Sequence, residues 1–228
     1  MNRFMKGVTA ASLLILLAGS AVESQVRFGV KGGLSISNLW GDGISGFEDD
    51  LLISDPVTSV EQGWVYSVTG GVFLRYDFIP DFLAFQPELL YLRGGKSWDV
   101  NNEELKAYID YITVPVLFKL MIPLDIPVTP SAYVGPVFSY SLRARTEGLD
   151  NVPAGSDLGF MTGFGEEIDD AVNDFDIGLA TGLSFDIETG PGAVVLDFRY
   201  HWGLLEVFDG QDVRNYAFQL MAGYSLDY

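Results

Sequence analysis

The chain has 228 residues, of which 48% are hydrophobic and 14% aromatic, and 31 acidic against 13 basic residues give it a net charge of −18. The absence of cysteine excludes a disulfide scaffold and a thiolate metal site, and a single histidine excludes any centre built from several histidines. The strong negative charge excludes broad electrostatic binding of nucleic acid.

Residues 1–24 are predicted to form a cleaved secretory signal peptide. Arg3 and Lys6 precede the apolar run GVTAASLLILLAG at 7–19, which is too short to cross a bilayer as a helix. Small residues follow it, and we place the cleavage site near Ser24. An uncleaved membrane anchor is the alternative. No later stretch is apolar for long enough to form a transmembrane helix, so residues 25–228 are expected to be exported as one domain.

The exported part of the chain alternates between apolar and polar residues in long segments. In 26–40, Phe28, Val30 and Leu34 share one face, while Lys31 and Ser35 share the other. A period of two residues is typical of a strand with two different faces. The same pattern predicts eight strands, at 26–40, 64–78, 83–93, 108–120, 132–142, 175–187, 194–204 and 216–228.

These strands predict an all-β fold, namely an eight-stranded antiparallel up-and-down transmembrane β-barrel. Each segment is long enough for the roughly 9–11 residues with which a tilted strand crosses a bilayer. An even number of strands that each have one apolar face fits a closed membrane barrel. Aromatic residues at strand ends, such as Trp40, Trp64 and Trp202, suit its interfacial girdles. A two-sheet sandwich with an aromatic core is the alternative fold.

The predicted connections alternate between long and short. The long ones, at 41–62, 94–107, 144–174 and 205–213, carry 20 acidic and three basic residues. In bacterial outer-membrane barrels the long loops are extracellular, and the short turns are periplasmic. We therefore expect an outer-membrane protein with acidic extracellular loops and both termini in the periplasm. The acidic charge favours solubility of the loops, and binding of divalent cations or of a surface ligand is the alternative.

The polar faces of the strands predict a charged interior. An eight-stranded barrel is only wide enough to be filled by side chains, and buried charges must pair. The sequence therefore predicts a plugged, salt-bridged lumen rather than an open channel. The residues expected in this polar network are Lys31, Arg75, Glu88, Lys119, Arg143, Asp176, Asp197 and Arg199.

The single histidine, His201, also falls on the inward face. It could belong to a serine–histidine–acid site of a lipid-modifying barrel hydrolase, but such a site must meet lipid, whereas His201 faces the lumen. We therefore interpret His201 as structural, and we predict no catalytic residues, no metal site and no cofactor.

Four segments carry a resemblance to a known family. GVKGGLSISNL at 29–39, FQPELLY at 85–91, TVPVLFK at 113–119 and AYVGPVF at 132–138 resemble the small outer-membrane β-barrel domain of Bacteroidetes-type bacteria, often called porin-like or PorT-like. The resemblance implies insertion by the barrel-assembly machinery, which recognises an aromatic residue in the last strand, and Tyr228 fits that role.

Pro87, Pro115 and Pro136 lie inside predicted strands, where we expect local bulges.

Together these features predict a non-enzymatic outer-membrane barrel that serves envelope structure or surface interaction through its acidic loops. Its expected partners are outer-membrane lipid and lipopolysaccharide, with the assembly machinery and periplasmic chaperones during biogenesis. Three alternatives stay open: a narrow porin-like channel, an accessory barrel in secretion or motility, and a soluble lipocalin-like carrier.

Overall fold

The computed structural model describes residues 26–44, 59–100, 103–147, 172–208 and 212–228. The predicted signal peptide lies outside this part of the chain, as do the centres of two predicted acidic loops. Among the described residues, no helix is long and apolar enough to cross a membrane.

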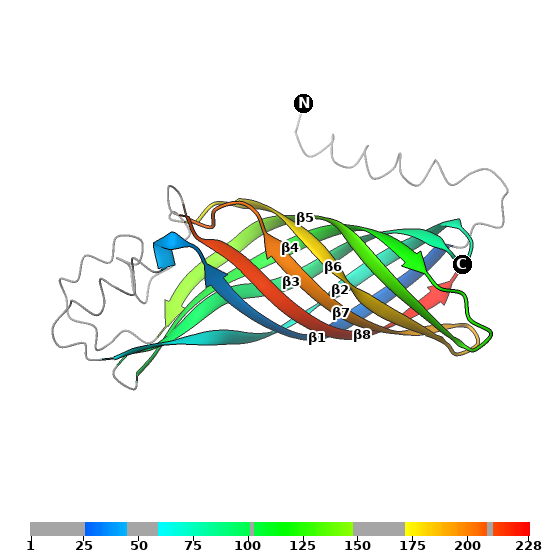
Figure 1. Cartoon of the computed structure of the whole chain (residues 1–228), viewed down its shortest axis with the longest axis horizontal. Helices are drawn as coiled ribbons and strands as arrows, with labels where there is room; N and C mark the ends of the chain where they lie inside the picture. The colour runs from blue at the N-terminus through cyan, green and yellow to red at the C-terminus, as the bar shows by residue number, and fades with distance from the viewer. Residues whose placement is uncertain (1–25, 45–58, 101–102, 148–171, 209–211) are drawn as a thin grey trace, which may run out of the picture.

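The chain forms a closed antiparallel barrel of eight strands in sequence order, as predicted (Figure 1). Each strand pairs with the next, and the last pairs with the first along its whole length, from Arg27↔Asp227 to Trp40↔Arg214. The strands are β1 (Val26–Trp40), β2 (Val60–Ile79), β3 (Leu83–Val100), β4 (Glu103–Met121), β5 (Val128–Glu147), β6 (Phe175–Glu188), β7 (Gly192–Gly203) and β8 (Arg214–Asp227).

The two ends of the barrel differ in their connections. One end, here called the turn end, has the connections 80–82, 122–127 and 189–191 and the C-terminus (Figure 1). The opposite end, here called the loop end, has the connections 41–59, 101–102, 148–174 and 204–213. The predicted loop 94–107 is wrong, because β3 and β4 continue as a paired hairpin to Val100↔Glu103.

Apolar side chains face outward over most of the barrel wall. Leu34 is 63% exposed and Tyr66 is 74% exposed, whereas Lys31 and Ser35, on the other face of β1, are buried. An apolar surface of this extent would be unfavourable in water and suits contact with lipid. A lipocalin-like carrier would need the apolar face inside, and the structure has it outside.

The three prolines inside strands cause no bulge, contrary to the prediction. The pairs Pro87↔Val116 and Leu90↔Thr113 keep one register on either side of Pro115, and Pro136↔Leu179 lies in an unbroken ladder. In an antiparallel sheet a residue directs its N–H toward only one neighbouring strand, so each proline removes a single ladder bond. The shifts of register occur elsewhere, in β2–β3 and in β4–β5.

Candidate functional site

Four charged side chains meet inside the barrel and form what we call the central network: Lys31, Glu88, Asp197 and Arg199. Lys31 Nζ lies 2.7 Å from Glu88 Oε1 and 2.6 Å from Asp197 Oδ2. Arg199 completes the ring, with Nη1 2.8 Å from Glu88 Oε2 and Nη2 3.0 Å from Asp197 Oδ2. All four side chains are at most 2% exposed. Two cations therefore balance two anions within one buried ring.

Neutral side chains complete the hydrogen bonding of the central network. Tyr133 donates its hydroxyl hydrogen to Asp197 and accepts a hydrogen bond from Arg199 Nε at 3.1 Å. Gln86 Nε2 donates to Glu88 Oε1 at 2.6 Å. A buried charge is stable only when its remaining hydrogen-bonding positions are satisfied. The hydrogen bonds from Tyr133 and Gln86 therefore help to stabilise the four charges in the barrel interior.

Gly182 provides the space that Tyr133 occupies. A Cβ atom at this position would lie 2.4 Å from Tyr133 Oη and 2.2 Å from the carbonyl oxygen of Phe198. Both distances are below van der Waals contact, and one of the two atoms belongs to the backbone. A side chain at Gly182 would therefore displace the phenol from Asp197 and Arg199.

We expect Gly182→Ala to destabilise the barrel by about 1–3 kcal/mol, the usual cost of overpacking a well-packed interior. Thermal unfolding in detergent measures the effect. Gly32→Ala is the matched control, since its nearest atom would be 3.5 Å from the new Cβ and its backbone φ needs no glycine. An unchanged melting temperature for Gly182→Ala would show that Tyr133 is not held against this glycine.

A second charged group, the turn-end network, lies closer to the turn end and consists of Arg75, Asp77, Lys119 and Asp186. Arg75 Nε lies 3.0 Å from Asp77 Oδ1, and Arg75 also pairs with Asp186. Lys119 Nζ is 3.7 Å from Asp186 Oδ1. These four side chains are also buried and also carry no net charge.

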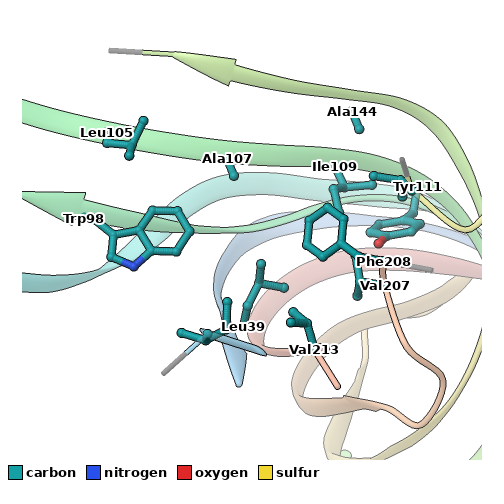
Figure 2. Packing of buried hydrophobic residues seen from close by; sticks show 12 residues of the cluster. Leu39, Trp98, Leu105, Ala107, Ile109, Tyr111, Ala144, Val207, Phe208 and Val213 are labelled. Carbon is teal, nitrogen blue, oxygen red and sulfur yellow. The ribbon is translucent and has the colours of Figure 1, made fainter. Parts of the chain in front are cut away.

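A cluster of buried apolar residues lies inside the barrel at the loop end (Figure 2). Val207 and Phe208, from the connection between β7 and β8, pack there against inward residues of β3 and β4. Backbone hydrogen bonds fix this segment, from Val207 N to Val213 O at 2.7 Å and from Asn173 N to Val207 O at 2.9 Å. We call this group the mouth cluster: Leu39, Ile44, Trp98, Leu105, Ala107, Ile109, Tyr111, Ala144, Val172, Val207, Phe208 and Val213.

Six of the eight residues predicted for the polar network lie in the two networks just described: Lys31, Glu88, Asp197, Arg199, Arg75 and Lys119. Asp176 is buried but lies apart from both, and accepts a hydrogen bond from the backbone N–H of Leu205 at 3.2 Å.

Arg143 is exposed on the outer surface, which differs from the prediction. The cause is a bulge in β5, where Asp110↔Arg143 is followed by Tyr111↔Ser141, so that Leu142 is an extra residue. An extra residue shifts the alternation by one position, and Arg143 therefore points outward.

Some interior residues are missing from the predicted network. Asp77 and Asp186 occupy inward positions, so the alternation of apolar and polar residues in the sequence could have identified them as interior charges. Tyr133 and Gln86 are also inward but neutral. His201 is buried in the lumen as predicted, and its Nε2 has no hydrogen-bond partner among the described residues.

A closed barrel of eight antiparallel strands with an apolar outer wall and a charged interior has the architecture of a transmembrane β-barrel. The family model described as "Outer membrane protein beta-barrel domain" matches residues 18–209. The chain belongs to this family and is an outer-membrane β-barrel protein. A comparison with curated protein sequences finds no match.

Several solved structures are similar in fold. The attachment invasion locus protein Ail of Yersinia pestis is 14% identical, with a TM-score of 0.44 over 89% of this chain and 99% of that chain. The Neisserial surface protein A is 16% identical, with a TM-score of 0.40 over 88% and 97%. OprG of Pseudomonas aeruginosa is 11% identical, with a TM-score of 0.42 over 91% and 100%.

Proposed function

We propose that the protein is a non-enzymatic barrel with a sealed interior, which serves envelope structure or surface interaction through its acidic loops. The observation that carries this proposal is the filling of the interior. From the turn end to the loop end, the turn-end network, the central network and the mouth cluster occupy the lumen in succession. This arrangement favours a sealed barrel over a narrow channel.

The difference between the two ends supports a proposal for the direction of insertion. In bacterial barrels the short turns are periplasmic and the long loops extracellular. We therefore assign the turn end, with the C-terminus, to the periplasm and the loop end to the outside. The acidic residues then gather outside, where they could hold divalent cations or a surface ligand.

The engagement of the charged groups supports a structural rather than a catalytic interior. Each charged side chain of the central network is buried and contacts an opposite charge. None of Lys31, Glu88, Asp197 and Arg199 is therefore presented at the surface to a substrate. His201 is 4% exposed and faces the lumen. A hydrolase acting on lipid would need its histidine on a surface that lipid can reach.

We extend the proposal to ancestry and biogenesis. The segments at 29–39 and 85–91 support a place in the Bacteroidetes-type, PorT-like branch of the family. Insertion by the barrel-assembly machinery, with periplasmic chaperones, is proposed on the same resemblance. A signal peptide at 1–24 would deliver the chain to the periplasm.

The purified protein, reconstituted into a planar bilayer, is expected to show no reproducible conductance steps, because side chains fill the lumen at three levels. A porin measured in parallel controls for the sensitivity of the assay. Conductance steps of constant size would contradict the sealed interior and favour the channel.

Orientation is tested separately with protease added to intact cells. Cleavage is expected in the connections of the loop end and not at the turn end. Cleavage at the turn end in intact cells, with cleavage at the loop end only after lysis of the outer membrane, would overturn the assigned direction of the loops.

A further inference from the structure

Large apolar side chains are exposed at the turn end, beyond the strands that form the apolar wall. In the connection between β4 and β5, Ile122 and Ile126 are each 57% exposed and Leu124 is 48% exposed. Ile79 and Phe82, at the turn between β2 and β3, are exposed as well. Single apolar residues are common on protein surfaces, but a group of them marks a contact surface. We call these five residues the apolar rim.

The two connections that carry the apolar rim lie side by side. The backbone N–H of Met121 donates to the carbonyl oxygen of Phe82 at 2.8 Å, which joins the β2–β3 turn to the start of the β4–β5 connection. At the far end of that connection, the backbone N–H of Glu188 donates to the carbonyl oxygen of Pro127 at 2.9 Å. The β4–β5 connection is therefore fixed to the barrel at both ends, and its apolar side chains are presented as one surface.

The apolar rim continues the apolar wall on β4. Phe118 and Leu120, the last outward residues of that strand, are exposed, and Ile122 follows at the same spacing of two residues. Toward the loop end, the first charged residue at an outward position of β4 is Asp110. The wall on this strand therefore has only the nine residues 112–120, the low end of the roughly 9–11 with which a tilted strand crosses a bilayer. Lipid contact on this side thus requires apolar surface beyond the strand.

The sequence of the β4–β5 connection suits the boundary between lipid headgroups and acyl chains. Irregular backbone is not stable in pure hydrocarbon, because its N–H groups need partners, but headgroups and water supply them at the boundary. Pro123 and Pro127 have no N–H, which lowers this need further. Asp125 lies between Leu124 and Ile126 and is exposed, so its carboxylate can stay with the headgroups while the apolar side chains enter the acyl region.

We infer that the apolar rim is inserted into the bilayer, in contact with the acyl chains of the lipids at the turn end. Continuity with the lipid-facing wall argues for lipid rather than for a protein partner. The β6–β7 turn at the same end, Thr189, Gly190 and Pro191, has no large apolar side chain, so this insertion is confined to the side of β2–β5. The proposed orientation makes the leaflet the periplasmic one, but contact with lipid does not depend on it.

The test uses the full barrel in phosphatidylcholine vesicles, with single-cysteine variants that carry an environment-sensitive fluorophore. Labelling is specific because the chain has no cysteine of its own. Leu124→Cys and Ile126→Cys report on the apolar rim, and Leu120→Cys reports on the wall. Pro191→Cys is the matched control, an exposed position in another turn of the same end. Heat-modifiable mobility on a gel verifies that each variant is folded.

Two quenchers locate each label: a nitroxide on the lipid acyl chain, close to the glycerol, and iodide in the water on both sides of the membrane. Labels at 124 and 126 are expected to be quenched by the nitroxide as the label at 120 is. Iodide should quench them about tenfold less than the label at 191, since burial of one large apolar side chain shifts an equilibrium by about tenfold or more. The result should be the same at two protein-to-lipid ratios.

Equal quenching by iodide at the apolar rim and at 191 overturns the proposal, because the rim would then lie in water. Protection from iodide only at the higher protein-to-lipid ratio would assign the rim to contact with a second copy of the chain. Protection in native outer membranes but not in vesicles would assign it to a protein partner, and both of these outcomes overturn lipid contact. None of the measurements depends on conductance, so failure here is distinct from failure of the sealed barrel.

Discussion

Glu88→Ala is expected to destabilise the barrel by about 3–5 kcal/mol, because removing one partner of a buried ion pair leaves uncompensated charge. Glu88 contacts both cations of the central network, Lys31 and Arg199. Its loss leaves two buried cations against Asp197 alone. For a chain of this size the cost corresponds to a fall in melting temperature of roughly 6–20 °C in detergent.

Glu88→Gln should be milder, since the amide keeps the shape of the side chain and one acceptor oxygen. Glu104→Ala is the surface control: its side chain is 57% exposed and pairs with Lys106, so we expect a change of at most about 1 kcal/mol. If Glu88→Ala and Glu104→Ala melted at the same temperature, the central network would contribute nothing to stability.

Leu220→Arg is expected to cost about 2–4 kcal/mol of folding free energy in lipid vesicles, the cost of an arginine on the lipid face near the midplane. Leu220 lies near the middle of β8, is 49% exposed and is flanked in the sheet by Leu34 and Phe198. Urea unfolding in vesicles measures the difference from wild type.

Leu226→Arg makes the same substitution on the same face of β8, two residues from the C-terminus, where Leu226 is 53% exposed. There we expect a cost of only about 0–1 kcal/mol, because the arginine reaches the interface. Equal costs at Leu220 and Leu226 would mean that the outward apolar face is not in contact with a bilayer.

The strand segments that form the apolar wall are predictable from the sequence, because contact with lipid on one side and with the lumen on the other requires opposite polarity at alternate residues. β1 matches its predicted range of 26–40, and β6 differs by one residue. The inward charges of these strands are predictable for the same reason. Their partners are less so, because Lys31 meets Glu88 and Asp197 across the lumen, on β3 and β7, and alternation within one strand gives no information about distance across the barrel.

The loop end is harder to predict because the alternation continues there with inverted polarity. Beyond the apolar wall, Lys106 and Arg145 face outward toward water, while Leu105 and Ala107 face inward into the mouth cluster. A pattern that changes sign within one strand, with Gly94, Gly95 and the Asn101–Asn102 pair nearby, is typical of a loop in the sequence. Arg143 is a separate case, since a single extra residue in β5 reverses its direction.

The pairing of β8 with β1 also imposes an order on assembly. The first and last strands are joined by fourteen residue pairs. They are also joined by the Arg27–Asp227 ion pair at 2.6 Å and by the hydrogen bond from Tyr228 N to Val26 O at 3.0 Å. These contacts cannot form until the last strand has been made. Lys31 is on the first strand and Asp197 on the seventh, so a half-closed sheet would hold their charges apart and expose them to lipid. The pairing of β8 with β1 and the pairing of the interior charges therefore belong to one late, cooperative step of folding. This step is expected to be slow because it brings together residues that are far apart in the sequence.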